Sequence, residues 1–550
     1  MSRFLTTLLA TAAGSPHGMA TGDPRAMVRR TWPEIHQAAR RGAGALTAAG
    51  VGPGSAVGVL AGDPGAIAPA VQAIWLVGGS VTMLHQPTAR TDLGAWAEET
   101  VGVLNMIGAE FVLLGAPFDG LAPVLAGRGI PYRRLSDLEG EPLDADAGVA
   151  REDDTALLQL TSGSTAEPKA VRITHGNLHV NIGAMVQAAR LDPDGDVMVS
   201  WLPLFHDMGM VGFLTIPMVV GIELVSVTPT DFLRRPLLWA ELISAHRGTV
   251  TAAPNFAYAV LARQLARAEG PLDLSTLRFA LNGAEPVDPE AVAAFTTAGA
   301  RFGLRPESVV CAYGMAETAL GVSFAPVDTG LQVDEIDAVA LEEHRRAVPA
   351  VTDRGKTRRF PLLGPPLPGL EVRVVGDDGA VRGDREVGVL QLRGGSVTPG
   401  YLTVDGPVAT QDVDGWLDTG DEGYLADGAV VVCGRRKDVI IMGGRNIYPT
   451  DIERAASAAD DVRAGNAVAV RLEADDDRHR ESFLVAVESR RAGEPEAVRV
   501  IRKDVTSRVV SAVGVRPAEV VVLGPGSLPK TPSGKLRRAA TRALLVAARG

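Results

Sequence analysis

A run of small hydroxyl residues carries the first recognisable chemistry of this sequence. Residues 160–171 read LTSGSTAEPKAV, which puts four hydroxyl side chains and several backbone amides on one turn, followed by Lys169. Hydroxyls and backbone N–H groups on a tight turn can nest phosphate oxygens, and a lysine adds a compact positive charge. The spacing is not the G-x-x-x-x-G-K-[ST] pattern of P-loop proteins, and such clusters also occur in ordinary loops. On its own, the run is a candidate phosphate loop of another kind.

Four later stretches carry residues that suit the rest of a nucleotide. CAYGMAET (311–318) offers an aromatic ring to stack on a base, a carboxylate for Mg²⁺ and a hydroxyl for phosphate. GWLDTGDEG (415–423) holds two aspartates in a turn, where a carboxylate can accept both hydroxyls of a ribose. GRRKD (434–438) and LPKTPSGKLRR (528–538) add basic residues. Each stretch alone could be a turn, a surface ion pair or a solvated tail, but together they predict one nucleotide site.

Lysine usage agrees with this interpretation. Only six of the 54 basic residues are lysine, so a lysine is a candidate for a point-charge role that arginine does not fill. Four of the six fall inside these motifs: Lys169, Lys437, Lys530 and Lys535. Lys356 and Lys503 are interpreted as ordinary surface residues, and Lys530 as a charge at the rim of the site.

Composition limits the class of protein. A chain of 550 residues is too long for one core, and a net charge of −11 argues against sequence-independent binding of nucleic acid. No apolar run reaches the roughly 18 residues of a membrane-spanning helix. Threonines interrupt the opening stretch MSRFLTTLLATAAG, which favours an amphipathic first helix over a signal peptide. Two cysteines without metal or disulfide spacing suit a reducing cytoplasm, where we expect the protein to be located.

The elements that must position the motifs follow three patterns. Apolar runs such as TALLQL and LRFALNGAEP alternate with helical segments and predict an α/β fold of parallel sheets with helices. Ligands of such sheets bind beyond the carboxyl ends of the strands. From about 365 to 434, polar–apolar alternation predicts a β-rich subdomain, and 435–550 has the pattern of a small α+β domain. We therefore expect a large domain at 1–434, a small mobile domain at 435–550, and a charged, exposed excursion at about 331–362.

These motifs, in this order, resemble the adenylate-forming (AMP-binding) superfamily of acyl ligases and nonribosomal-peptide adenylation domains over nearly the whole chain. Four stretches are most similar to the fatty acyl-AMP ligases: SWLPLFHDMGMVG, APNFAY, LRFALNGAEPV and GRNIYPTDIE. The resemblance implies that ATP and Mg²⁺ activate a medium- or long-chain fatty acid as an acyl-adenylate, with release of pyrophosphate. The acyl group would then pass to the phosphopantetheine thiol of an acyl carrier protein or of a carrier domain in a polyketide or nonribosomal peptide synthase.

The resemblance also implies which residues bind the nucleotide. The β- and γ-phosphates would be held by Thr161, Ser162, Gly163, Ser164, Thr165 and Lys169. The adenine would be lined by Asn282, Gly283, Ala284, Tyr313, Gly314 and Met315, with the Tyr313 ring stacked on it. Asp421 would hold the ribose hydroxyls, and Arg435 would assist at ribose and phosphate.

Catalytic roles are implied in the same way. Glu317 would bind Mg²⁺, Thr318 would touch the α-phosphate, and His206 would lie beside the reacting carboxylate. Lys437 would be the hinge about which the small domain rotates. Lys535, on that domain, would lie between the attacking carboxylate and the α-phosphate and offset the repulsion between these two anions.

Several alternatives stay open. Ala166 stands where the family usually has a second glycine in the phosphate loop, and it either stiffens the loop or slows the ATP site. The excursion resembles the insertion of fatty acyl-AMP ligases, thought to limit domain rotation and CoA use, but a fatty acyl-CoA ligase is the nearest rival. The apolar stretch 208–225 could leave room for an acyl tail or could be a buried helix and strand. A third hypothesis is a catalytically idle relative that binds nucleotide or acyl groups.

Overall fold

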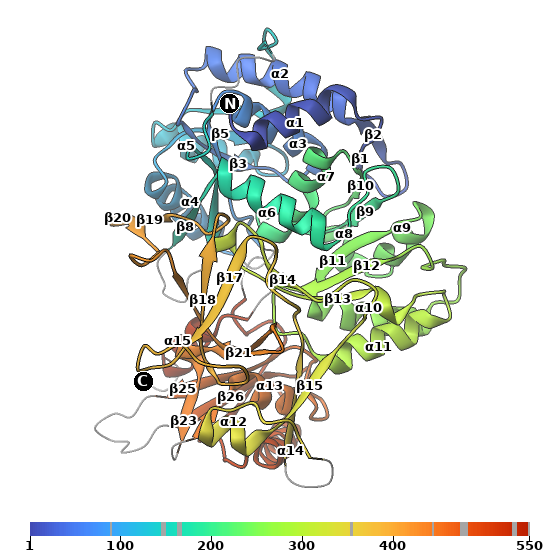
Figure 1. The fold of residues 1–550 in the computed structure, drawn as a ribbon, viewed down its shortest axis with the longest axis vertical. Helices are drawn as coiled ribbons and strands as arrows, with labels where there is room; N and C mark the ends of the chain where they lie inside the picture. The colour runs from blue at the N-terminus through green and yellow to red at the C-terminus, as the bar shows by residue number, and fades with distance from the viewer. Residues whose placement is uncertain are drawn as a thin grey trace.

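The computed structural model describes residues 1–88, 91–144, 150–161, 168–351, 356–442, 445–472, 482–530 and 536–547. Most of the predicted phosphate loop, from Ser162 to Glu167 and including Ala166, lies outside these ranges, as does Lys535. Figure 1 shows a large upper body built from the first part of the chain, and a smaller lower part built from its end.

The first of two large sheets ends at the predicted adenine motifs. Its strand order is β14-β13-β12-β11-β9-β10-β1-β2; neighbours from β13 through to β1 run parallel, and the pairs at the two edges run antiparallel. The run LRFALNGAEP contains a strand at 279–283, as predicted. The strands are β1 (Gly18–Thr21), β2 (Val28–Thr31), β9 (Val197–Ser200), β10 (Glu223–Ser226), β11 (Val250–Pro254), β12 (Phe279–Gly283), β13 (Val309–Gly314) and β14 (Gly321–Phe324).

The second large sheet carries the phosphate-loop motif. Its order is β20-β19-β8-β7-β4-β3-β5-β6, parallel from β7 to β6 and antiparallel from β7 to β20. The motif lies between β7 and β8, and the late hairpin β19–β20 extends the sheet beyond β8. The strands are β3 (Ala56–Leu60), β4 (Ser80–Met83), β5 (Ala109–Leu114), β6 (Tyr132–Arg134), β7 (Thr155–Thr161), β8 (Lys169–Thr174), β19 (Gly400–Thr403) and β20 (Gly406–Ala409).

Helices cover these sheets and share one large core with them. Three tryptophans, Trp32, Trp75 and Trp239, are almost fully buried in it. The α-helices of the large body are α1 (Arg3–Gly14), α2 (Trp32–Ala48), α3 (Pro64–Leu76), α4 (Leu93–Met106), α5 (Ala122–Gly127), α6 (His175–Ala188), α7 (Ile216–Val220), α8 (Pro229–Arg234), α9 (Leu238–Ala245), α10 (Asn255–Arg267) and α11 (Pro289–Ala300). Short 3₁₀ turns lie at Asp119–Leu121 (η1), Leu135–Asp137 (η2), Pro306–Ser308 (η5) and Ala316–Thr318 (η6).

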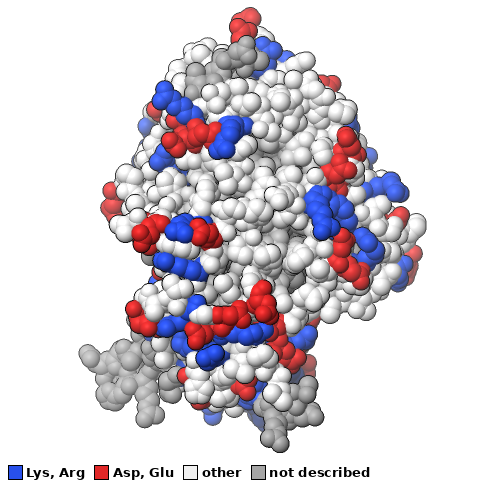
Figure 2. All heavy atoms as spheres, viewed as in Figure 1, with Lys and Arg blue, Asp and Glu red and all other residues white. Residues whose placement is uncertain are grey.

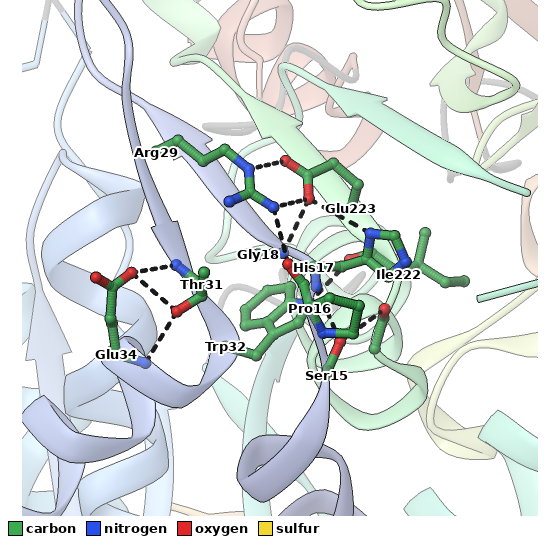
Figure 3. A network of polar contacts seen from close by, with 11 residues as sticks. Ser15, Pro16, His17, Gly18, Arg29, Thr31, Trp32, Glu34, Ile222 and Glu223 are labelled. Carbon is green, nitrogen blue, oxygen red and sulfur yellow. Dashed lines mark hydrogen bonds and ion pairs between the residues drawn. The ribbon is translucent and has the colours of Figure 1, made fainter. Parts of the chain in front are cut away.

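The first residues pack onto the body as an amphipathic helix, as predicted. Ser2 caps α1 by accepting a hydrogen bond from the Leu5 amide, and the helix buries its apolar face, including Phe4 and Leu8. Figure 3 shows how the following hairpin β1–β2 is joined to β10: Glu223 at the start of β10 accepts two hydrogen bonds from Arg29 of β2, of 2.6 and 2.7 Å. This hairpin therefore closes one edge of the first sheet.

A four-stranded antiparallel sheet forms the predicted β-rich subdomain. Its order is β17 (Leu370–Val375), β18 (Gly388–Gly394), β21 (Leu417–Ala426) and β22 (Ala429–Arg435). The excursion before it folds as the hairpin β15 (Val333–Asp337) and β16 (Thr357–Pro361) with helix α12 (Ala338–His344) between the strands.

The excursion is less exposed than we expected. The side chains of Arg358 and Glu342 are 8% and 7% exposed. The excursion is therefore only partly exposed, because these charges are paired across an interface: Arg358 forms an ion pair with Asp451, and Glu342 with Arg445. Both partners belong to the last part of the chain.

That last part has its own apolar core, formed by residues between Ile440 and Val522. It contains the hairpin β23 (Ile440–Met442) and β24 (Arg445–Ile447), and the sheet β25 (Ala467–Leu472), β26 (Ser482–Glu488) and β27 (Glu519–Leu523). Its helices are α13 (Pro449–Ser457), α14 (Pro495–Val513) and α15 (Arg538–Ala547), preceded by the short turn η7 (Arg436–Asp438). In the described chain, no helix is long and apolar enough to cross a membrane. On the face drawn in Figure 2, acidic and basic side chains are intermingled.

Candidate active site

The predicted ribose carboxylate sits in a buried cluster with two other predicted residues. The Tyr313 hydroxyl at the end of β13 donates to Asp421 Oδ2 at 2.5 Å, and Arg435 Nε lies 2.8 Å from Asp421 Oδ1. The Asp421 side chain is 7% exposed. Burial raises its pKa, and the Arg435 charge and the Tyr313 hydroxyl oppose that rise. Tyr313, which lies more than a hundred positions before the other two residues in the chain, thus meets them at one point.

The turn before Asp421 selects which aspartate faces inward. Gly420 has a φ of +71°, a left-handed conformation that favours glycine, and its amide donates to Asp418 Oδ1 at 2.7 Å. Asp418 remains outside, 3.2 Å from Arg436, whereas Asp421 is buried. Of the two aspartates in the motif, the structure therefore makes only Asp421 available to a ligand held beside Tyr313.

A second cluster joins the phosphate-loop motif to the predicted metal carboxylate. Lys169 Nζ, at the start of β8, lies 3.7 Å from Glu317 Oε1, and the Tyr401 hydroxyl of β19 donates to the same oxygen at 2.7 Å. Lys169 also lies over the Tyr401 ring, 3.7 Å from its centroid. Burial lowers the pKa of Lys169, and Glu317 opposes that shift.

The two clusters belong to one site. The charge of Arg435 acts on Asp421 and, from the other side, on Lys169 and Tyr401. Glu317 in turn raises the pKa of Asp421 beyond the effect of burial. The charges of the two clusters therefore interact, which indicates that the clusters lie near each other in the fold.

The predicted adenine loop follows β12. Asn282 is fully buried; its side-chain amide donates to Asn255 Oδ1 at 3.1 Å, while its own Oδ1 has no hydrogen-bond partner among the described residues. Ala284 has a φ of +65°, which costs a residue with a Cβ about 1 kcal/mol or more. An unpaired buried oxygen and a strained backbone are both found at ligand sites, because the ligand and the surrounding packing offset their cost.

The segment after Tyr313 is tightly held. A Cβ on Gly314 would lie 2.4 Å from the Leu320 carbonyl oxygen, and the Met315 amide donates to that oxygen at 2.8 Å. Thr318 is fully buried, and its hydroxyl donates to the Met315 carbonyl at 3.0 Å, a bond it would have to break to donate to a phosphate. Its contact with the α-phosphate stays a prediction.

His206 lies in the loop after β9, just before the π-helical segment η4 (Met208–Thr215). Its Nδ1 is 2.5 Å from Asp207 Oδ1. Gln159 of β7 fixes the loop by donating to the Phe205 carbonyl at 3.0 Å. Burial, then the charges of His206 and Arg537, lower the pKa of neighbouring His85 to about 4, so that imidazole is neutral at pH 7.

Described residues of the last domain on both sides of 531–535 lie close to the large body. Lys535 lies outside the described residues, but residues on either side of it interact with the large body. Burial lowers the pKa of Lys530, and the charges of Glu488 and of Glu285, beside the adenine loop, oppose that shift. The charge of Arg537 contributes to the lowered pKa of His85, after burial and His206. Arg454 of α13 lies 3.7 Å from Asp288 at the start of α11. Lys437, in η7, is exposed and lies near the charges of Arg435 and Lys169.

Sequence reasoning missed four residues of this site: His85, Gln159, Asn255 and Tyr401. Tyr401 is the next-to-last residue of the stretch GGSVTPGYL, which lies in the region noted only for its alternation of polar and apolar residues. Gln159, a polar residue in the apolar run TALLQL, could have been noticed because buried polar side chains need a purpose. Asn255 lies in APNFAY, one of the stretches that carry the family resemblance, but no role was predicted for it; His85 carries no local signature.

The structure combines a body of parallel sheets, a smaller last part, and two clusters of an aromatic ring, carboxylates and cations, which are side chains that suit a nucleotide. Comparison with known proteins specifies the class. The model of the AMP-binding enzyme family matches residues 10–402. The chain belongs to this family of adenylate-forming ligases, which use ATP to activate a carboxylic acid.

The matched relatives differ in sequence identity and in the share of the chain that they cover. "Putative ligase Rv1013" of Mycobacterium tuberculosis is 58% identical over 98% of this chain and 99% of its own length. "Putative acyl-CoA synthetase" of Caulobacter vibrioides is 34% identical over 91% of this chain and 88% of its own length. "Medium-chain-fatty-acid–[acyl-carrier-protein] ligase JamA" of Moorena producens is 35% identical over 71% of this chain and 67% of its own length.

A solved structure from studies of fatty acyl-adenylate ligases of E. coli and L. pneumophila superposes with a TM-score of 0.90. It is 30% identical and covers 100% of this chain and 98% of that one. The fold class expected from the sequence, a large α/β domain followed by a small domain, is confirmed.

Proposed function

We propose that this enzyme converts a medium- or long-chain fatty acid and ATP into an acyl-adenylate and pyrophosphate, and then transfers the acyl group to the phosphopantetheine thiol of a carrier protein. The observation that carries the first step is the pair of polar clusters, Tyr313–Asp421–Arg435 and Lys169–Glu317, whose charges interact. We also infer a cytoplasmic location, which agrees with two buried, unpaired cysteines.

The residues present fit ATP and Mg²⁺. Two oxygen atoms in the predicted nucleotide set, Thr161 Oγ1 and Asn282 Oδ1, are buried without a hydrogen-bond partner among the described residues. In the described chain, no group of three His, Cys, Asp or Glu side chains forms a metal cage. Mg²⁺ needs none, because it is commonly held by one or two carboxylates together with substrate phosphates. Glu317 supplies such a carboxylate; bound Mg²⁺ would neutralise charge on the phosphates.

The chemical difficulty of the first step is the approach of two anions. The fatty acid carboxylate must attack the α-phosphate, which builds charge on the phosphoryl oxygens. Lys535 would be carried to that point by the small domain, and His206 would position the carboxylate. Support for this assignment comes from Lys530 and Arg537, which lie on either side of Lys535 in the sequence and interact with the large body. A single preorganised charge of this kind contributes about 10²–10³-fold to the rate.

The acyl tail would enter the apolar region that begins beside His206. All eight residues of η4, Met208–Thr215, are buried, and α7 and β10 continue the apolar stretch. The sequence left open whether this stretch is a tail site or a buried helix and strand. It is a buried helical segment and strand, and its π-helical turn beside His206 is of a kind frequent at functional sites.

The excursion supports a carrier protein as acceptor. It holds the small domain at several points: Glu342 pairs with Arg445, Arg358 pairs with Asp451, and Lys356 Nζ donates to the Ser511 carbonyl at 2.9 Å. Rotation about Lys437 to a second orientation must break these contacts together. We propose that this restraint disfavours the state that coenzyme A needs.

A fatty acyl-CoA ligase is the second candidate, favoured by the name of the Caulobacter relative. Both candidates share the first step, which is tested by incubating the enzyme with ATP, Mg²⁺ and single fatty acids from C6 to C18, with mass-spectrometric detection of the acyl-adenylate. We expect adenylate from at least one acid. Absence of adenylate from every acid would reject both candidates in favour of a catalytically idle relative.

A further inference from the structure

Tyr401 touches both charged groups of the phosphate side of the site. Its hydroxyl donates to Glu317 Oε1 at 2.7 Å, and its ring lies under Lys169 at 3.7 Å from the ammonium nitrogen. Lys169 and Glu317 are themselves 3.7 Å apart. One side chain therefore contacts the cation and the anion of the same pair.

The pairing of β19 with β8 places Tyr401 beside Lys169 and Glu317. In β19, Tyr401 pairs with Val171 and Thr403 pairs with Lys169 of β8. The Thr398 amide just before β19 donates to the Glu317 carbonyl at 2.7 Å, and its hydroxyl donates to the Arg172 carbonyl at 2.5 Å. The segment that carries Tyr401 is thus bonded to the strand of Lys169 and to the turn of Glu317.

The two contacts have different chemical consequences. A carboxylate oxygen that accepts a hydrogen bond from a fixed hydroxyl leaves its other oxygen directed to a metal, and such outer partners commonly change metal affinity 10- to 100-fold. An ammonium group over an aromatic ring is attracted by the ring itself and needs no anion to hold it. Lys169 is therefore kept in place over Tyr401 when Glu317 binds a metal ion instead.

We propose that Tyr401 is a positioning residue for the adenylation step: its hydroxyl orients Glu317 toward Mg²⁺, and its ring holds Lys169 at the phosphates. The inference rests on the proposed function for the identity of the nucleotide and metal. It does not depend on the fatty acid or on the acyl acceptor.

Two substitutions separate the two contacts. Tyr401→Phe keeps the ring and removes the hydroxyl, so the Mg²⁺ concentration for half-saturation should rise about tenfold, with the Michaelis constant for the fatty acid unchanged. Tyr401→Leu removes the ring as well, so the Michaelis constant for ATP should also rise, by about three- to tenfold.

A matched control uses another tyrosine that donates to a carboxylate. The Tyr424 hydroxyl donates to Asp334 Oδ2 at 2.7 Å, away from the two clusters, so Tyr424→Phe removes an equivalent bond outside the site. This variant should leave both the Mg²⁺ and the ATP dependence unchanged within twofold. A general loss of packing would instead affect the Tyr401 and Tyr424 variants alike in a thermal melt.

Calorimetric titration with α,β-methylene-ATP at several Mg²⁺ concentrations separates this inference from the proposed function, because no acyl substrate is present. We expect Mg²⁺ to strengthen nucleotide binding in the wild-type protein, and about tenfold less in Tyr401→Phe. Equal Mg²⁺ dependence in the two proteins would overturn the role of Tyr401, and so would wild-type binding that ignores Mg²⁺. Failure to form adenylate while these titrations behave as expected would reject only the proposed function.

Discussion

At the scale of single residues, Asp421 illustrates how neighbours decide a role. Asp418 and Asp421 are three positions apart, but only Asp421 is buried beside Tyr313 and Arg435. A buried carboxylate that is already aligned by two donors can accept ribose hydroxyls without reorganisation.

Asp421→Asn keeps the shape and removes the charge. Hydrogen bonds to charged groups are worth about 1.5–3 kcal/mol, so the Michaelis constant for ATP should rise by about 10- to 100-fold. Steady-state release of pyrophosphate at varied ATP checks this value. Asp418→Asn, on the exposed side of the same turn, serves as control and should change the constant less than twofold. Equal effects of the two variants would contradict the assignment.

Lys535 requires a different measurement, because its predicted role is confined to the transition state. Lys535→Ala should lower the rate of adenylate formation by about 10²–10³-fold or more while binding of Mg²⁺ and ATP changes little. Rapid-quench measurement of the first turnover, together with titration of the nucleotide, separates the two quantities. Lys503→Ala, on the exposed surface of α14, should leave both unchanged. A variant at Lys535 with nearly normal adenylation would remove it from the mechanism.

At the scale of elements, Asp196 ties together the starts of three neighbouring strands. It precedes β9; Arg278, before β12, donates from Nε to Asp196 Oδ1 at 2.8 Å, and Thr249, before β11, donates to the same oxygen at 2.7 Å. Burial alone would raise the pKa of Asp196, but these bonds and one from the Asp192 amide outweigh it and lower the pKa. A lowered pKa in the folded state stabilises the protein above the unfolded value near 4, and that stabilisation is lost as pH falls through the folded pKa.

Asp196→Ala should therefore destabilise the protein at pH 7 by about 3 kcal/mol, because Arg278 loses its buried partner. The difference from the wild type should begin to shrink as pH falls below about 4, where Asp196 of the unfolded chain takes up a proton, and should be lost at the lower pH where folded Asp196 is protonated. Urea unfolding midpoints at pH 7 and pH 3.5 test both statements. Asp194→Ala, whose side chain is 91% exposed, is the control. A difference that does not change with pH would show that the charge of Asp196 is not responsible.

Sequence patterns predicted β7 and β12 well, because each lies in a short apolar run, TALLQL or LRFALNGAEP, that is followed by turn residues. They could not predict the φ of +65° at Ala284 or of +69° at Ala319, because glycine is the usual indicator of such a backbone and neither residue is glycine. They also missed Tyr401, whose position depends on the pairing of β19 with β8, and the burial of Arg358, which depends on Asp451. These features arise from contacts between distant segments, which local periodicity does not encode.

At the scale of the whole molecule, the orientation of the small domain is the central variable. Arg358 on β16 is buried against Tyr448, 4.8 Å from the ring centroid, and pairs with Asp451, whereas Arg359 on the same strand is exposed. Arg358→Ala should loosen the small domain and raise the yield of acyl-CoA at least severalfold, while adenylate formation persists. Arg359→Ala is the matched control and should leave the yield unchanged. No gain of acyl-CoA in Arg358→Ala would mean that this contact does not restrain the domain.

The most direct test of the account follows the fate of the acyl-adenylate. The wild-type enzyme, ATP, Mg²⁺ and the preferred fatty acid would be incubated with coenzyme A, with a phosphopantetheinylated acyl carrier protein, or with neither, and the products resolved by mass spectrometry. We predict acyl-adenylate that persists with coenzyme A and is consumed by the carrier protein. Rapid formation of acyl-CoA, with the carrier protein left unacylated, would contradict the proposed acceptor and identify the enzyme as a fatty acyl-CoA ligase.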